Sequence, residues 1–348
     1  SSALNFYTAR FQLTNPEIET VEGKLAPHTI GFTLSRQVNE GIHEELELVN
    51  YSGHKVSFLL ELELYSDFAD ISEVRTHKII PRGEQQTVWQ AKTHQLRTAY
   101  QHKDYHRTAI YRITHATSPV NYANGRLAFE ITLDSHGKWH ACGDIILEYG
   151  QHIPKMMLKS CSYAQRSAST KDAFAEKQAH WRNRCTTITT PNNTLFRMYN
   201  QAITNMGALR IYDRDVSDDA WITAAGRPWF MTIYGRDSLI TSYQNMLVSP
   251  DFARGALKRL AEYQATRRND WQDAQPGKIM HEIRFGELAH FHKKPIAPYY
   301  GTADATILYL IVLSETYRWT GDLLLLKEYR KVAENCLHWI DHYGDLDG

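Results

Sequence analysis

The spacing of the apolar residues changes once along the chain, and this change constrains the fold more than any other feature. Every second residue is apolar from Val56 to Leu64 and again from Leu127 to Leu133, with mostly polar residues between them. A period of two places one face of a strand on a core. Such strands, separated by short polar turns at 50–53 and 135–138 and by no helix, predict an antiparallel β-sandwich over residues 1–150.

From about residue 171 the apolar residues follow a helical period. Phe174 and Trp181 predict a helix in a linker over 151–190, and 190–193 reads as the start of a longer helix. The apolar stripe expected on that longer helix is Leu195, Met198, Tyr199, Ala202 and Met206. Further helices are predicted near Asp237, after Ser249 as N-cap, after Thr302 as cap, and from about Asp322.

These helices are joined alternately by short turns and by long polar segments such as 266–301. That alternation is typical of a ring of helical hairpins with its long loops at one mouth. The helices are too few to close a ring, the helix at 307–311 is apolar on nearly every side, and both chain ends look cut. We therefore expect a partial α/α barrel over 191–348, with further helices beyond Gly348.

Charge and cysteine content exclude several classes. Lys+Arg and Asp+Glu both total 39, which argues against nucleic acid as a partner, and no apolar run reaches the roughly 18 residues of a membrane span. Four cysteines lie far apart in the sequence: Cys142, Cys161, Cys185 and Cys336. Isolated cysteines of this kind are most often inert and buried, and they suit a reducing compartment, so we expect a cytoplasmic protein.

The segment 227–238 carries the first candidate binding residues, which are Trp229, Tyr234, Arg236 and Asp237. A sugar is held by an aromatic surface under its apolar ring face and by bidentate charged groups on neighbouring hydroxyls. In the alternative interpretation, Asp237 caps the following helix and Arg236 forms an ion pair.

Two further segments add candidate residues. The long loop at 271–287 offers Trp271, Lys278, His281, Glu282 and Arg284, and the segment 299–304 offers Tyr300 and Asp304. A solvated loop face would explain the charges in 271–287 equally well. All three segments precede or join helices at the same end, however, so in a ring they would converge on one mouth and form a pocket.

Cofactor chemistry finds no support in the sequence. His290 and His292 form the tightest histidine pair, and His281-Glu282 lacks the second histidine of a helical zinc motif. No glycine-rich loop suits a phosphate, and Ser238 lacks the context of a serine nucleophile. We therefore expect neither a metal nor a cofactor.

Taken in order, Gly235-Arg236-Asp237-Ser238, the segment 277–284 and the segment 300–306 resemble the amylo-α-1,6-glucosidase (glycogen-debranching-type) family of six-hairpin α/α-barrel glycosidases. Segments 13–16, 47–51 and 67–75 look like the N-terminal β domain of that family. The resemblance implies hydrolysis of an α-glucosidic bond with inversion, by an acid and a base about 6.5–9.5 Å apart.

The resemblance also implies that Arg236 and Asp237 hold the hydroxyls of a terminal glucose. The general acid and base of the family are expected beyond Gly348, so no catalytic residue is assigned and the isolated chain is expected to be inactive. Glu282 and Glu287 are weaker candidates for the acid.

Two other functions stay open. One is a disaccharide phosphorylase, which shares the layout and uses phosphate in place of the base. The other is a non-catalytic carbohydrate-binding protein. An α-glucan or glucoside is the expected ligand, with maltose, trehalose and limit dextrins as candidates; the sequence leaves the oligomeric state undetermined.

Overall fold

The computed structural model describes residues 2–3, 6–20, 23–38, 41–149, 173–212, 214 and 216–344. The chain divides into two compact units: Ser1–Ala69 with Ile79–Glu176, the β unit, and Asp70–Lys78 with Lys177–Gly348, the helical unit. Most of the predicted linker and Cys161 lie outside the described residues. Within the described residues, no helix is both long and apolar enough to span a bilayer.

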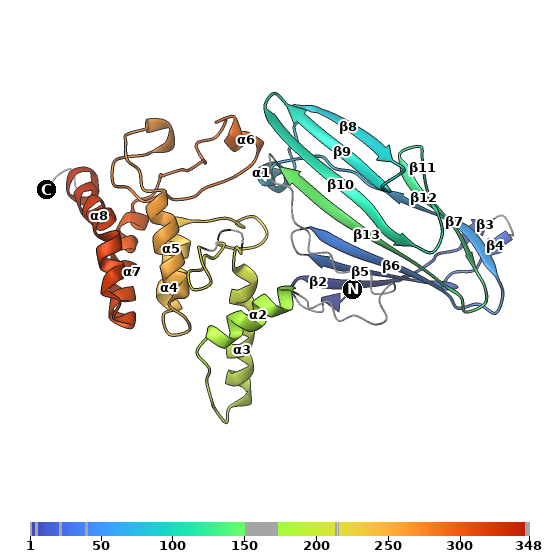
Figure 1. Cartoon of the computed structure of the whole chain (residues 1–348), viewed down its shortest axis with the longest axis horizontal. Helices are drawn as coiled ribbons and strands as arrows, with labels where there is room; N and C mark the ends of the chain where they lie inside the picture. Colours follow the sequence, from blue (N-terminus) through green and yellow to red (C-terminus); the bar gives the residue numbers. More distant parts are fainter. Residues whose placement is uncertain are drawn as a thin grey trace. The chain divides into compact units, whose positions relative to one another are not determined.

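Among its described residues, the β unit holds an eight-stranded, a three-stranded and a two-stranded sheet, each antiparallel throughout (Figure 1). The largest sheet runs β1-β2-β5-β6-β13-β10-β9-β8, the second β11-β12-β7, and the third β3-β4. The strands are β1 (Ser2–Ala3), β2 (Thr8–Thr14), β3 (Ile18–Thr20), β4 (Gly23–Leu25), β5 (Ile30–Val38), β6 (Ile42–Asn50), β7 (Val56–Glu63), β8 (Glu84–Gln90), β9 (Gln95–His102), β10 (Tyr105–Ala116), β11 (Val120–Ala123), β12 (Arg126–Leu133) and β13 (Lys138–Tyr149).

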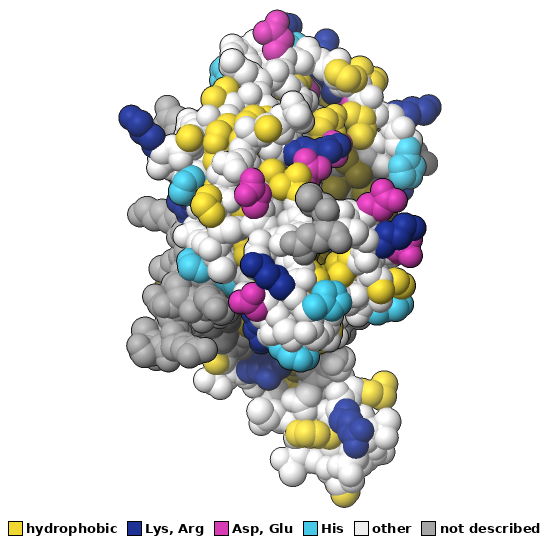
Figure 2. All heavy atoms as spheres, turned by 90° about the vertical axis from the view of Figure 1, so that its right-hand side faces the viewer, with side chains coloured by type: hydrophobic (Ala, Val, Ile, Leu, Met, Phe, Trp, Pro, Cys, Tyr) yellow, Lys and Arg dark blue, Asp and Glu magenta, His cyan; other side chains and the backbone are white. Residues whose placement is uncertain are grey.

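The core of the β unit lies between its two larger sheets, so the predicted sandwich is confirmed. Leu127, Phe129, Ile131 and Leu133 of β12 are each at most 2% exposed, as their period of two predicts. They pack in one cluster with side chains of the larger sheet, including Leu46. On the face seen in Figure 2, basic and acidic side chains are interspersed and neither sign forms a continuous patch.

The helical unit is built around four helices, α4, α5, α7 and α8, which contact one another in the pairs α4–α5, α4–α7, α5–α7 and α7–α8. Its helices are α1 (Ile71–Thr76), α2 (Ala173–Arg184), α3 (Asn193–Leu209), α4 (Gly235–Gln244), α5 (Asp251–Glu262), the 3₁₀ turn η1 (Asp270–Gln272), α6 (Glu287–His290), α7 (Asp304–Thr320), α8 (Leu323–Trp339) and the π-helical turn η2 (Ile340–Gly344). An apolar cluster centred on Leu239, Leu257 and Tyr309 fills the space between the four main helices.

Several local expectations need correction. The stripe predicted on α3 is wrong at Leu195, Met198 and Ala202, which are exposed. The buried residues of that helix are Ile203 and Gly207. The Trp181 indole donates a hydrogen bond to the Ile203 carbonyl at 2.9 Å, so α2 selects a different face of α3.

Two predicted helix caps also differ. The N-cap of α5 is Pro250. Ser249, one residue before this N-cap, accepts a hydrogen bond at Oγ from the Asp251 amide at 3.3 Å. The N-cap of α7 is Ala303, because the Thr302 hydroxyl bonds the Asp304 carboxylate instead of the helix backbone.

Helix α1 was not foreseen, and it belongs with the helical unit although its neighbours in sequence are strands. Asp70, which precedes it, accepts hydrogen bonds from the amides of Glu287 at 3.0 Å and Leu288 at 2.8 Å, the first residues of α6. Gly286 has φ +141°, and a Cβ there would lie 2.1 Å from Asp70 Oδ1. A glycine is therefore required where these two segments meet.

The cysteines divide into two kinds. Cys185 and Cys336 are free and buried, and burial raises the pKa of each thiol to about 12, as expected for inert cysteines. Cys142 is disulfide-bonded, so its interpretation as an isolated thiol was wrong.

Candidate functional site

Three segments distant in sequence meet beside the first turns of α4 and α7. Arg236 Nη1 of α4 lies 3.2 Å from Asp304 Oδ2 of α7, and Arg236 Nε lies 4.0 Å from Asp237 Oδ2. The side chains of Arg236 and Asp304 are 48% and 39% exposed, so both remain accessible to a ligand. The first and third predicted segments therefore share a charged cluster, which is here called the Arg236 cluster: Arg236, Asp237 and Asp304.

The backbone brings the 271–287 loop to the same place. Glu282 forms β-bridges with both Tyr234 and Tyr299, and the Gly235 amide donates to the His281 carbonyl at 2.8 Å. A Cβ on Gly235 would lie 2.1 Å from the Met280 carbonyl oxygen, so this approach requires a glycine. The segments around Tyr234, Glu282 and Tyr299 therefore form one short strand-like layer.

Side chains of this layer form a second charged group. Arg284 Nε donates to Glu282 Oε2 at 2.8 Å, and Arg284 Nη1 donates to the Trp229 carbonyl at 2.8 Å. Arg284 Nη2 donates to the Tyr234 hydroxyl. Burial, followed by a hydrogen bond to Glu282, raises the pKa of Tyr234, so this hydroxyl stays protonated. At 17% exposure each, Glu282 and Arg284 are held in one geometry.

The protonation of Asp304 is set by its neighbours. Burial acts to raise its pKa, but hydrogen bonds from Thr302 and Arg236 outweigh that effect and lower it. Asp304 is therefore a carboxylate at neutral pH and can accept hydrogen bonds from a ligand.

Two hollows flank these residues. The first, of about 350 Å³, is lined by Trp229, Glu282 and Arg284 together with Ser72, Arg75, Phe285 and Lys294. The second, of about 710 Å³, is lined by Asp273, Lys278, Thr302, Trp339 and neighbouring residues. Both volumes lie in the range of ligand sites, about 300–1,000 Å³.

In the larger hollow, Lys278 is held over an aromatic ring. Its Nζ lies 5.5 Å from the centre of the Trp339 ring, and burial lowers the pKa of this amine. Trp339 is fixed in turn by donating to Gln275 Oε1 at 2.7 Å. An amine, an amide and an indole therefore share this wall.

Three predicted site residues lie away from the charged groups. Tyr300 is buried and donates to the Tyr263 carbonyl at 2.8 Å, which makes it part of the helical core. Trp271 is 58% exposed on η1 and lines neither hollow. His281 lies edge-on between the rings of Tyr234 and Tyr299, with centroids at 5.5 and 6.1 Å, so it supports the layer from inside.

Sequence reasoning missed three residues beside the site. Tyr299 donates to Asp273 Oδ2 at 2.7 Å, and this hydrogen bond raises the pKa of the tyrosine. Asp273 and Trp339 line the larger hollow. Asp273 and Tyr299 belong to the segments already singled out, so their composition could have indicated them, whereas Trp339 is 35 residues beyond Asp304 in a helix with no distinguishing pattern.

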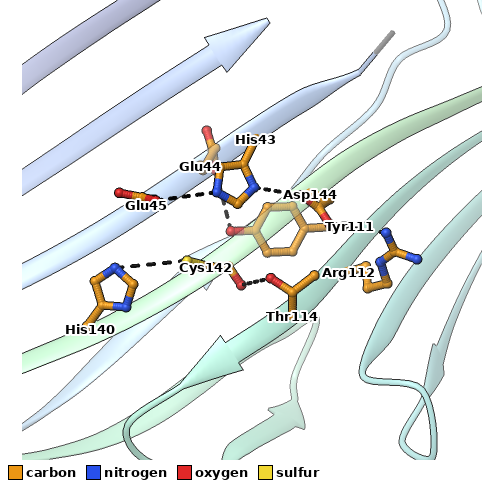
Figure 3. A network of polar contacts seen from close by, with 9 residues as sticks. All are labelled: His43, Glu44, Glu45, Tyr111, Arg112, Thr114, His140, Cys142 and Asp144. Atoms are coloured by element: carbon orange, nitrogen blue, oxygen red, sulfur yellow. Dashed lines mark hydrogen bonds and ion pairs between the residues drawn. The ribbon is translucent and has the colours of Figure 1, made fainter. Parts of the chain in front are cut away.

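A separate group of polar side chains is buried in the β unit (Figure 3). His43, Glu45 and Cys142 have atoms of metal-ligating type within 4.8 Å of one another. Burial acts to lower the pKa of His43, but Asp144, whose Oδ1 lies 2.8 Å from Nδ1, and Glu45 raise it to about 9. Cys142 is disulfide-bonded and offers no thiolate, and His43 is held by Asp144, so these side chains form an ion-pair network.

Comparison with known proteins gives a family match for the first part of the chain and a fold match for nearly all of it. Residues 1–144 match the family model described as the N-terminal domain of (some) glycogen debranching enzymes. No curated protein sequence matches the chain. A protein described as a kojibiose phosphorylase, from the human microbiome, superposes with a TM-score of 0.51 at 10% identity, over 96% of this chain and 43% of its own length.

This chain thus spans less than half of that structure, and the likeness shows a shared fold. A polysaccharide lyase aligns with 97% of this chain over 61% of its own length, at 9% identity. Its TM-score of 0.24 is too low to indicate a common fold.

Proposed function

Because residues 1–144 form a domain of the type that begins some glycogen debranching enzymes, we propose that the chain is part of an α-glucan-acting glycoside hydrolase and binds glucosyl units at the Arg236 cluster. The observation that carries this proposal is the 3.2 Å contact between Arg236 and Asp304, which joins the ends of two helices beside exposed, ionised groups. Arg236 offers a planar donor fork, and the two carboxylates accept hydroxyl protons.

Neither Glu282 nor Glu287 suits the part of general acid. The Glu282 carboxylate accepts a charge-assisted hydrogen bond from Arg284, which engages it in positioning that arginine. Glu287 is 3% exposed in the first turn of α6 and lines neither hollow. We therefore assign binding, not proton transfer, to this chain, and we expect it to be inactive alone.

Calorimetric titration of the 348-residue chain with glucose and maltose tests the binding site. We expect Arg236→Ala to weaken binding at least about tenfold, since a hydrogen bond to a charged group contributes about 1.5–3 kcal/mol. Asp237→Asn should weaken it less. The matched control is Arg318→Ala, which removes an arginine from the exposed face of α7. If both the Arg236 and the Asp237 variants bind glucose and maltose with unchanged affinity, the Arg236 cluster is excluded as the sugar-binding site.

A phosphorylase is the second candidate, favoured by the shared fold with the protein described as a kojibiose phosphorylase. It differs from a hydrolase in needing inorganic phosphate as the second substrate. Release of a sugar phosphate by the complete protein only in the presence of phosphate would select the phosphorylase. Sugar binding without turnover under either condition would select a non-catalytic carbohydrate-binding protein.

A further inference from the structure

Helix α1 forms one wall of the smaller hollow, although it lies more than 150 residues before the other wall. Ser72 and Arg75 come from α1, and Trp229, Glu282, Arg284 and Lys294 come from the segments after α3. All of these residues belong to the helical unit. A short segment inserted between strands is therefore built into the surface that carries Glu282 and Arg284.

The position of α1 is fixed by specific contacts. Its preceding residue Asp70 caps α6 at two backbone amides, and the Asp70 amide donates in turn to Glu73 Oε2 at 3.1 Å. His77 ends the helix in a left-handed conformation with φ 54°. Lys294 Nζ lies 3.4 Å from Ser72 Oγ, which ties the far wall to α1. A wall held at both ends is suited to recognition, because little conformational freedom is lost on binding.

The chemistry of the hollow suits a hexose. Trp229 and Phe285 provide aromatic surface, and the fixed Glu282–Arg284 pair provides an acceptor and a donor at 17% exposure each. The guanidinium carbon of Arg75 lies 5.2 Å from the centre of the Phe230 ring, and Arg75 is exposed at the rim. The volume of about 350 Å³ matches a ligand of one or two sugar units.

The hollow is also connected to the Arg236 cluster. Arg284, which lines the hollow, donates to the Tyr234 hydroxyl, and Tyr234 lies two residues before Arg236. We propose that α1, through Ser72 and Arg75, forms a subsite with Trp229 and Lys294 for a glucosyl unit beyond the one held at the Arg236 cluster. The subsite makes the chain prefer an oligosaccharide to glucose. This inference rests on the proposed function.

The test compares chain lengths. The 348-residue chain is titrated with glucose, maltotriose and isomaltotriose, for the unmodified chain, for Ser72→Ala/Arg75→Ala, and for the control Arg318→Ala. We expect the unmodified chain and the control to bind one trisaccharide about tenfold more tightly than glucose, which corresponds to about 1.4 kcal/mol. The double variant should lose that preference while its affinity for glucose is unchanged.

A second variant, Ser72→Trp, fills the hollow without removing Arg75 and should abolish the same preference. Thermal unfolding of each variant shows whether α1 stays folded. A preference for trisaccharide that persists in both variants, or is absent from the unmodified chain, would overturn the subsite while leaving glucose binding at the Arg236 cluster in place. Failure of every sugar to bind the unmodified chain would instead overturn the proposed function, and the subsite with it.

Discussion

The two units differ in where they place their charged side chains. The β unit buries charge: Asp144 is fully buried and is bonded both to His43 and to Arg112, whose Nη2 lies 3.1 Å from Asp144 Oδ2. The main interior of the helical unit is apolar, and ion pairs such as Arg236–Asp304 and Arg254–Asp322 lie at the ends of its helices. It also leaves large apolar side chains exposed on α7 and α8, such as Ile307 and Leu324. Charged side chains are therefore paired inside the first unit, whereas those of the Arg236 cluster in the second unit stay exposed.

The largest expected effect tests whether the two interiors are separate. Phe129 of the β unit and Phe252 of the helical unit are each at most 1% exposed. Replacing either with Ala removes a buried ring and leaves a cavity, which costs about 3–5 kcal/mol. In differential scanning calorimetry we expect Phe129→Ala to lower one transition and Phe252→Ala to lower another.

The control pair is Tyr65→Ala and Tyr243→Ala, since these aromatic residues are 83% and 51% exposed. Neither should move a transition by a comparable amount. Equal shifts of all transitions by both phenylalanine variants would show that the units unfold as one.

The second effect is a loss of stability of the β unit at alkaline pH. The pKa of His43 is raised from 6.5 to about 9 in the folded state, so the folded state binds its proton more tightly than the unfolded state. Its stabilisation is fully present below pH 6.5 and is lost as the pH rises through 9. The shift corresponds to about 3 kcal/mol, and urea unfolding at pH 6 and pH 9.5 measures it.

His43→Gln is the matched variant for this measurement. It will be less stable at pH 6, because Asp144 loses a charged partner, but the difference from the unmodified chain should shrink by pH 9.5. The same pH slope in both proteins would show that another group titrates. The helical unit contains no comparable buried histidine pair with a carboxylate among its described residues, so its transition should change less over this range.

The same contrast explains how much could be predicted from the sequence. The period of two at 127–133 gives the buried face of β12 directly, because a sandwich strand has only two faces. A helix can bury any of several faces, and the partner that packs on it decides which one. On α3 this is the face of Gly207, where Trp181 packs so closely that a Cβ would lie 2.8 Å from its Nε1. The loops at the Arg236 cluster could be indicated by composition, and that they meet is confirmed by the bridges at Glu282.

Helix α1 and its wall of the hollow could not be predicted. The helix has six residues, too few for a periodic signal. Its position depends on the hydrogen bonds that Asp70 accepts from the amides of Glu287 and Leu288, which lie 217 and 218 residues further along the chain. A contact of this kind leaves no pattern in a single sequence.

A smaller effect is expected at the start of α3, where the helical unit depends on a local hydrogen bond instead of on packing. Asn192 Oδ1 accepts from the amides of Thr194 at 3.0 Å and Leu195 at 3.1 Å. Asn192→Ala should destabilise the helical unit by about 1 kcal/mol, and Asn192→Ser should restore most of it. Chemical denaturation of the three proteins measures the difference; a loss with Ala that Ser does not restore would point to a role other than capping.

The smallest expected effect concerns the exposed apolar face of α8, and it is the sharpest test of the contrast between the units. Leu324 is 72% exposed and its neighbour Leu325 is 5% exposed, so the two positions share a helix turn but differ in environment. Leu324→Gln should change the free energy of unfolding by less than about 0.5 kcal/mol, as surface substitutions usually do. Leu325→Gln should cost several times more, because it places an amide in the core. A cost of more than about 1 kcal/mol for Leu324→Gln that falls on dilution would show that a second copy of the chain covers this face in solution. The helical unit would then bury its apolar side chains by association, whereas the β unit buries its own by folding.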